Sequence, residues 1–279
     1  MVIPSRVKPL TDAQSAVHQR RSSLSLVCKG NDKGVFIGTS GYSYSHWKGA
    51  FYPKDVKGEQ MLPFYASKFN TVEINSTFYH MPLSSTVGKW LKGLPDDFVF
   101  SLKANRAITH IRRLSDVGEL VNEFYAAATM LGDKLGVVLY QLPPSLKKDL
   151  DLLRSFLELV EEKPGKKAIE LRHVTWVDDE VFEVFEVLKE HNVAFVVSHG
   201  DNYPLVTTPT ADFMYVRLHG YPELYRSSYS AEELHKWANL IGTWLEQGKS
   251  VYVYFNNDMQ GHAVENALTL RSLITPTEQ

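Results

Sequence analysis

The sequence predicts an α/β protein with the fold of a (β/α)8 barrel, the TIM barrel. Six short segments place apolar residues at every second position, as Val72 and Ile74 do in TVEIN, which is the pattern of a strand with two different faces. Segments with a helical period lie between them, and strands that alternate with helices form parallel sheets. With two further short apolar runs, the series contains eight strands in about 240 residues, a length typical of one such barrel.

The eight predicted strands lie at 35–41, 71–75, 99–105, 136–142, 168–173, 194–199, 213–220 and 251–257. Helical periodicity predicts helices near 60–69, 83–93, 118–132, 149–161, 178–191, 231–247 and 262–274. The connection after the sixth strand differs, because Pro204, Pro209 and several threonines disfavour a helix. We therefore expect the helix after strand six to be missing or very short.

The 279 residues contain no Pro-, Gly- or Ser-rich linker that would divide the β/α series. We expect a single barrel domain over 35–275, preceded by a flexible N-terminal tail over 1–34. The tail lacks apolar periodicity and is rich in Ser and basic residues, including Arg20 and Arg21. Such a composition is also found in organelle-targeting peptides, an alternative that Asp12 disfavours.

Charge and cysteine content restrict the classes of partner. The formal net charge is −2 and the isoelectric point is about 6.6, so net charge does not support a nucleic-acid partner. The one cysteine, Cys28, suits a reducing compartment, and we expect a cytoplasmic protein. No apolar run reaches the roughly 18 residues of a membrane helix, so we expect no membrane partner. The sequence leaves the oligomeric state open.

The polar positions of the strands are expected to point into the barrel, because the outward positions must pack under the helices. Near the C-terminal strand ends these inward positions would line the mouth, where TIM-barrel active sites lie. They are Glu73, Asn75, Lys103, Asn105, Gln141, Glu170, Arg172, Ser198, Arg217, His219 and Asn256. Buried charges must pair with one another or with a ligand.

The five charged residues of this set comprise two carboxylates and three cations, and the surplus cation favours an anionic ligand such as a carboxylate or phosphate. The alternative is an internal salt-bridge network that only closes the barrel. In the loops after the first two strands, Trp47 and Tyr79 are candidates for stacking on a sugar ring or a base, although Trp47 also suits a small core under its loop. Asn257, after the last strand, is a further candidate at the mouth.

Six motifs occur in order at the predicted strand ends: GTSGYSYSHWKGAFYP, FNTVEINSTFYHMP, FVFSLKANRAITH, ELRHVTW, YVRLHG and YFNNDMQGHAVENA. Together they resemble the YecE-like family, catalogued as domain of unknown function 72, from about Val35 to Ile274. The resemblance implies a TIM barrel and no settled reaction. A looser similarity of fold connects such barrels to xylose isomerase and endonuclease IV. Ser198 departs from the acidic residue that we expect in the family, and the tail has no counterpart there.

We predict an enzyme of hydrolase or lyase type that acts on a small anionic or sugar-containing compound at the mouth. Glu73 and Glu170 would be its carboxylates, with His219 as the general acid. The predicted substrate-binding residues are Asn75, Lys103, Gln141, Arg172, Arg217, Asn256, Asn257, Trp47 and Tyr79.

Two alternatives remain open. A metal-dependent sugar isomerase or an endonuclease IV-like phosphodiesterase would need converging metal ligands, and no pair has a diagnostic spacing. A divalent metal is therefore possible but not favoured, and no metal ligand is assigned. The second alternative is a non-catalytic protein that binds an anion or a nucleotide.

Overall fold

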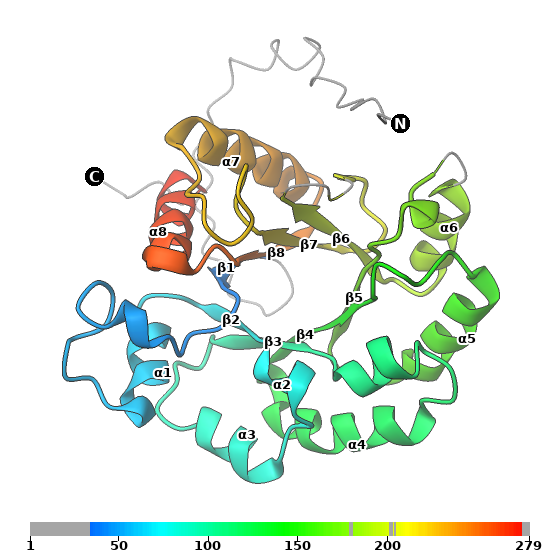
Figure 1. The fold of residues 1–279 in the computed structure, drawn as a ribbon, viewed down its shortest axis with the longest axis horizontal. Coiled ribbons are helices and arrows are strands. Elements are labelled where there is room, and N and C mark those ends of the chain that lie inside the picture. The colour runs from blue at the N-terminus through cyan, green and yellow to red at the C-terminus, as the bar shows by residue number, and fades with distance from the viewer. Residues whose placement is uncertain (1–33, 179–180, 201–202, 204, 275–279) are drawn as a thin grey trace.

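The computed structural model describes residues 34–178, 181–200, 203 and 205–274, and the tail predicted over 1–34 lies almost entirely outside this range. Eight parallel strands run around a ring, and the helices lie outside it (Figure 1). The strands are β1 Val35–Thr39, β2 Thr71–Ile74, β3 Val99–Lys103, β4 Leu135–Gln141, β5 Lys166–Glu170, β6 Ala194–His199, β7 Phe213–Leu218 and β8 Ser250–Phe255. The predicted TIM-barrel fold is confirmed.

The helices are α1 Gly58–Ala66, α2 Ser76–Tyr79, α3 Ser84–Trp90, α4 Gly118–Ala128, α5 Leu150–Val160, α6 Val181–Glu190, α7 Ala231–Glu246 and α8 His262–Ile274. Helix α4 ends four residues before the predicted end at 132, and the chain continues as a 3-10 helix from Thr129 in which Gly132, with a positive φ of 54°, breaks the helical backbone. The described residues between β6 and β7 form no helix, as predicted. One turn of π-helix, Ala107–Ile111, follows β3.

The ring is completed between its first two strands. The two ends of the hydrogen-bonded strand order are β1 and β2, and a parallel bridge joins Ser40 to Glu73. The Gly41 N–H donates to the Glu73 carbonyl over 2.7 Å. A Cβ placed on Gly38 would lie 2.2 Å from the Thr71 carbonyl oxygen. The small residues of the first strand therefore permit the close approach that closes the barrel.

The two faces of the strands form two separate apolar clusters. Outward residues such as Val72, Leu102 and Val253 belong to the large core between the strands and the helices. The interior is a smaller cluster of Val137, Leu139, Ala168, Ala194, Val196, Ala211, Phe213, Tyr215, Tyr252 and Tyr254. Aromatic and aliphatic side chains thus fill the lower part of the barrel, and the polar side chains sit above them at the mouth.

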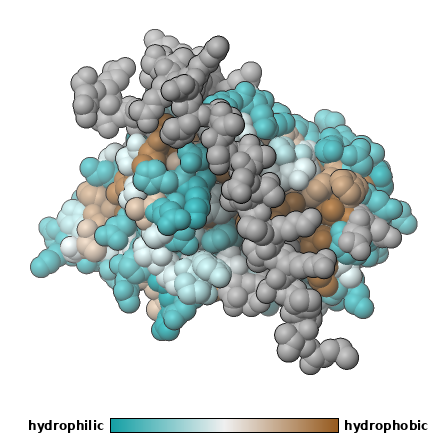
Figure 2. All heavy atoms as spheres, turned by 90° about the horizontal axis from the view of Figure 1, so that it is seen from above, coloured by the Kyte–Doolittle hydropathy of each residue, from teal (hydrophilic) through white to brown (hydrophobic). Residues whose placement is uncertain are grey.

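The helices bury one face against the strands and expose the opposite face on the outer surface. In α6, for example, Val184, Phe185 and Leu188 are buried whereas Phe182 is exposed. In the described part of the face in Figure 2, hydrophilic residues predominate around smaller hydrophobic areas. No helix within the described residues is long and apolar enough to cross a membrane.

Candidate functional site

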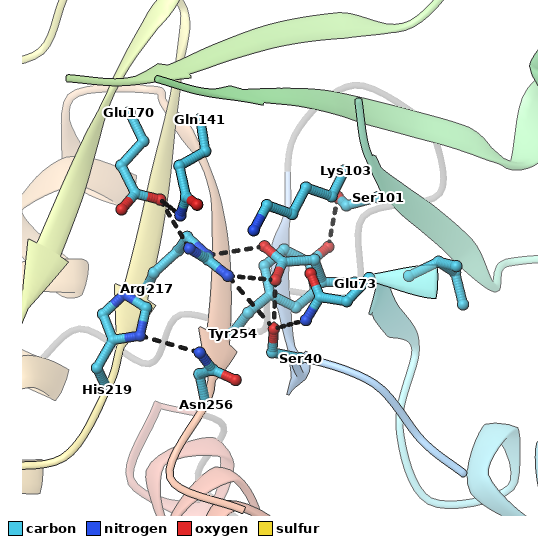
Figure 3. A network of polar contacts seen from close by, with 12 residues as sticks. Ser40, Glu73, Ser101, Lys103, Gln141, Glu170, Arg217, His219, Tyr254 and Asn256 are labelled. Atoms are coloured by element: carbon cyan, nitrogen blue, oxygen red, sulfur yellow. Dashed lines mark hydrogen bonds and ion pairs between the residues drawn. The ribbon is translucent and has the colours of Figure 1, made fainter. Parts of the chain in front are cut away.

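Arg217, on β7, lies at the centre of the barrel mouth (Figure 3). Its Nε and Nη2 atoms donate to the two oxygens of Glu73 on β2 over 3.0 and 2.9 Å. Its Nη1 donates to Glu170 Oε2 on β5 over 2.7 Å. The Arg217 residue is 1% exposed and joins two carboxylates from strands on different sides of the barrel. We call Glu73, Lys103, Glu170, Arg172 and Arg217 the mouth cluster.

Both carboxylate oxygens of Glu73 accept two hydrogen bonds each. Besides Arg217, Ser40 Oγ donates to Oε1, and the Tyr215 hydroxyl donates to Oε2 over 2.7 Å. A carboxylate offers about four acceptor sites, so the four donors leave none for a ligand. Glu73 is also fully buried. Its geometry is that of a counter-ion that positions Arg217.

Glu170 is held by three donors. Arg172 Nε donates to its Oε1 over 2.7 Å, and Gln141 Nε2 shares its Oε2 with Arg217 at 2.9 Å. Burial alone would raise the pKa of this carboxyl, but Arg217 and then Arg172 hold the pKa well below its ordinary value of 4.5. Glu170 is therefore a stable carboxylate and no proton donor.

Lys103, at the end of β3, is the cation of the mouth cluster that lacks a carboxylate. Its Nζ lies 4.1 Å from the centre of the Phe78 ring. Among the described residues, no carboxylate forms an ion pair with Nζ within 4.0 Å. Burial, and then the charge of Arg217, lower the pKa of Lys103 from 10.5 to about 8.

His219 presents an unused ring nitrogen. The Asn256 amide donates to Nδ1 over 3.0 Å, and because an amide NH₂ only donates, the neutral ring carries its proton on Nε2. Nε2 is buried and has no hydrogen-bond partner in the described part of the chain. Burial, and then Arg217, hold the pKa of His219 well below its ordinary value of 6.5. Burial and Arg217 thus favour a neutral ring that donates through Nε2–H, and the role of His219 as general acid stays a prediction.

Side chains from several loops surround this cluster. The Arg172 guanidinium lies 4.9 Å from the centre of the Tyr203 ring, and the His219 ring lies between Tyr203 and Tyr225 at 5.2 and 5.7 Å. Two more buried atoms, Asn75 Oδ1 and Ser198 Oγ, have no partner among the described residues. The mouth thus contains polar atoms that the described chain leaves unsatisfied, as a ligand site would.

The comparisons with known proteins agree with this fold. The family model described as "Protein of unknown function DUF72" matches residues 36–279. This chain belongs to the DUF72 family. Its sequence is 26% identical over 273 residues to the UPF0759 protein YunF of Bacillus subtilis, a match that covers 86% of this chain and 94% of YunF. The UPF0759 protein YecE of Escherichia coli is 31% identical over 142 residues, 50% of this chain and 48% of YecE.

Solved structures of DUF72 proteins have the same barrel. A DUF72 family protein from Thermotoga maritima superposes with a TM-score of 0.77 at 31% identity, over 86% of this chain and 99% of that chain. A D-psicose 3-epimerase from Clostridium cellulolyticum reaches a TM-score of 0.51 at 10% identity, over 86% and 98% of the chains. At that identity the likeness extends to the fold alone.

Among the described residues, the remaining predicted site residues of this DUF72 member form no hydrogen bond or ion pair with the mouth cluster. Trp47 is fully buried against Phe51 and Tyr52, and its Nε1 donates to the Asp258 carbonyl over 3.3 Å. It forms the small core under its loop and offers no surface for stacking, which corrects its assignment to substrate binding. Tyr79 is 63% exposed.

Asn257, a further predicted binding residue, is held by contacts within the chain. Its amide donates to the Ser227 carbonyl and to Asn266 Oδ1, both over 2.9 Å. It is fully buried and joins the end of β8 to the segment after β7. Both amide donors of Asn257 are therefore used within the protein, whereas its buried Oδ1 has no partner among the described residues, and its role in substrate binding stays a prediction.

Several residues at the mouth of this DUF72 protein were not predicted from the sequence to belong to the site. Tyr215 lies two residues before Arg217 on the same strand face, so the alternation that predicted Arg217 contained this signal. Ser40 directly follows β1 but stands in a run too rich in small residues to show alternation. His110, whose pKa burial and Lys103 lower to about 4, lies in the π-helix turn, and Tyr203 lies in an irregular loop.

Metal ligation has no preformed donor set in the part of the chain that the structure describes. No group of three or more His, Cys, Asp or Glu side chains is close enough there to hold an ion. The two carboxylates at the mouth are bound to Arg217 instead.

Proposed function

We propose that this DUF72 protein is an enzyme of lyase or hydrolase type that acts on a small anionic or sugar-containing compound at the barrel mouth. The observation that carries the proposal is the unmatched cation. Two carboxylates and three cations leave one positive charge in the mouth cluster, and Lys103 has no carboxylate partner in the described chain. A carboxylate or phosphate of the substrate would supply the missing negative charge.

The proposal gives the polar groups different tasks. Arg172 is 17% exposed and uses Nε on Glu170, so its remaining nitrogens can bind an anion. The Nε2–H of His219 would donate to a substrate oxygen on which negative charge develops. Glu170, whose three donors leave about one acceptor site open, is a better candidate for a base than the saturated Glu73.

A non-catalytic anion-binding protein is the second candidate. It is favoured by the saturation of Glu73, since an enzyme of the two-carboxylate type needs both carboxylates free to react. The two candidates share the anion site. Incubation with phosphorylated and carboxylated sugars distinguishes them: an enzyme would convert such a compound and a binding protein would not. Mass spectrometry and NMR would detect the conversion. Turnover that is lost in His219→Ala protein supports the enzyme.

The anion site itself can be tested with inorganic phosphate. A ligand that binds only the folded protein raises the unfolding midpoint with its concentration. We expect phosphate to raise the midpoint of the wild-type protein, and Lys103→Met and Arg172→Met to remove most of that increase. Lys92→Met, at an exposed lysine on the outer surface, is the matched control and should retain it. An unchanged midpoint in the wild type, or an equal increase in all variants, would refute the proposed site.

A further inference from the structure

Lys103 has the surroundings of a nucleophilic amine. It is the last residue of β3 and points into the mouth cluster (Figure 3). Its Nζ faces an aromatic ring and has no carboxylate partner among the described residues, in contrast to Arg172 and Arg217. A lysine kept only for its charge would normally pair with an acid, and Glu73 and Glu170 in the same cluster pair with arginines instead.

Burial, with the charges around Nζ, favours the free amine. The titratable and charged groups that act on Lys103 or stand beside it come from four parts of the chain: Glu73 on β2, His110 after β3, Glu170 and Arg172 at β5, and Arg217 and His219 at β7. Burial, and then Arg217, disfavour the ammonium, as Arg172 also does, whereas the charges of Glu170 and Glu73 favour it and offset part of this effect. With a pKa of about 8 in place of 10.5, the neutral fraction at pH 7 rises roughly 300-fold, to about a tenth.

We propose that Lys103 forms a Schiff base with the carbonyl carbon of the substrate, so that the substrates of this mouth are anionic aldehydes or ketones, such as oxo acids or sugar phosphates. The inference rests on the proposed function, because it uses the same anion site. Lysines next to other cations in desolvated sites are activated for this chemistry. It also names a catalytic residue that the sequence assigned only to binding.

The step balances without any further reactant. The ammonium first loses a proton, and the neutral amine attacks the carbonyl carbon while the π electrons move to the oxygen. That oxygen takes up two protons and leaves as water, so that R₂C=O and Lys103–NH₃⁺ give R₂C=NH⁺–Lys103 and H₂O. The iminium then accepts the electron pair of a neighbouring C–H or C–COO⁻ bond as that bond breaks, which gives an enamine and releases CO₂ or, to water, a proton. A proton from water then adds to the enamine carbon and restores the iminium. Hydrolysis by water returns the amine.

Two neighbours have roles that fit this step. Arg172 would hold the carboxylate or phosphate of the substrate, because part of its guanidinium is not engaged by Glu170. His219 would donate its Nε2–H to the carbonyl oxygen, because this proton is buried, fixed by Asn256 and unused within the described chain. A neutral imidazole suits this donor role beside three cations.

The experiment uses glyoxylate, the smallest anionic aldehyde, with sodium cyanoborohydride to reduce any imine. We expect irreversible modification of Lys103 in the full-length protein, with a mass increase equal to glyoxylic acid less one oxygen atom, located by peptide mass spectrometry. At pH 7, Lys103 should react at least about 30-fold faster than the exposed Lys92, since its amine is far more often neutral. The rate should rise with pH and level off above about 8.

The controls separate this inference from the anion site. Lys103→Arg, which keeps the charge but forms no imine, should show no fast modification while Lys92 reacts as before. Labelling of Lys103 no faster than Lys92, or a rate that keeps rising toward pH 10.5, would overturn the inference. The phosphate-dependent midpoint of the same wild-type sample reports the anion site separately. A phosphate shift without fast Lys103 labelling refutes the Schiff base and leaves the proposed site standing.

Discussion

At the scale of single residues, the mouth cluster contains two kinds of buried cation. Arg217 makes two hydrogen bonds to Glu73 and one to Glu170, which satisfies much of its planar donor set. Lys103 contacts an aromatic ring and, among the described residues, forms no ion pair with a carboxylate. A buried charge without a partner reduces stability, and such groups are found where function requires them. Substitutions of the paired Arg217 and of Lys103 should therefore change the free energy of unfolding in different ways.

Replacing Lys103 with Met should therefore stabilise the protein. The folded state disfavours the ammonium, so we expect a gain of about 2 kcal/mol at pH 7 after the lost contact with Phe78 is subtracted. The pKa is lowered by folding, so the gain should be complete below pH 8 and shrink as pH rises toward 10.5, where both states lose the proton. Urea unfolding at several pH values measures it. A loss of stability in Lys103→Met would mean that Lys103 is a structural cation.

Glu170→Gln should act in the opposite direction. The amide cannot accept from both Arg172 and Arg217 as the carboxylate does, so we expect a loss of about 3 kcal/mol at pH 7. Folding lowers the pKa of Glu170, so its contribution is present above pH 4.5 and is lost as pH falls below that value. The difference in unfolding free energy between the wild type and Glu170→Gln should thus become smaller at acid pH, as urea unfolding would measure.

The same Glu170→Gln protein should also be tested for ligand binding. If Glu170 takes part in the reaction or orients Arg172, the folded protein should lose activity or phosphate affinity. A large loss of stability with unaltered affinity per folded molecule would show that Glu170 is a counter-ion only.

At the scale of elements, the contact between β1 and β2 decides whether the barrel closes. These strands approach closely at Gly38, where a side chain would meet the Thr71 carbonyl. The Ser40–Glu73 bridge lies just above, so closure also delivers Ser40 and Glu73 to the mouth. The site and the closure of the fold are built from the same residues.

Gly38→Ala should consequently destabilise the protein by several kcal/mol, about 3 or more, because a Cβ 2.2 Å from a backbone oxygen forces the strands apart. It should also weaken phosphate binding, since Glu73 follows the shift. Gly242→Ala is the matched control: a Cβ placed on this glycine of α7 meets no atom within 4 Å, and the change should stabilise by about 0.5–1 kcal/mol. Equal unfolding free energies of the two variants would contradict this account of closure.

At the scale of the whole molecule, Arg217 ties distant parts of the chain together. Its partners Glu73 and Glu170 come 144 and 47 residues earlier in the sequence. Together the five charges replace the apolar layer that fills most TIM-barrel interiors at this level, while aromatic and aliphatic side chains fill the layers beneath. The mouth is therefore a polar end on an otherwise apolar barrel.

Arg217→Met should be the most damaging of the substitutions at the mouth. It leaves Glu73 and Glu170 charged and buried, and we expect a loss of at least about 3–5 kcal/mol at pH 7. The loss should diminish as pH falls, because Glu170, whose pKa Arg217 lowers, then becomes protonated. Arg154→Met, at the exposed pair with Glu190, should change stability by less than about 1 kcal/mol. A pH-independent loss in Arg217→Met would show that packing, and not charge, is what Arg217 contributes.

Much of the fold could be predicted because its signals are local. Alternation in a strand follows from backbone geometry alone, so Val72, Leu102 and Val253 could be assigned to the outer face without knowing their neighbours. The lack of a helix among the described residues between β6 and β7 agrees with the sequence, in which Pro204 and Pro209 disfavour a helix. The same rule of alternation predicted the inward direction of the charged side chains.

What the sequence by itself determined is thus the barrel and the set of polar residues that face its mouth. Only the tertiary structure decided how they pair: that Arg217 takes both carboxylates, that Lys103 is left without one, and that Trp47 is buried against a carbonyl 211 residues away. The face of a strand to which a side chain points depends on its neighbours in sequence. The ion pairs and the pKa values depend on distances between strands, and these distances are fixed only after the barrel has closed.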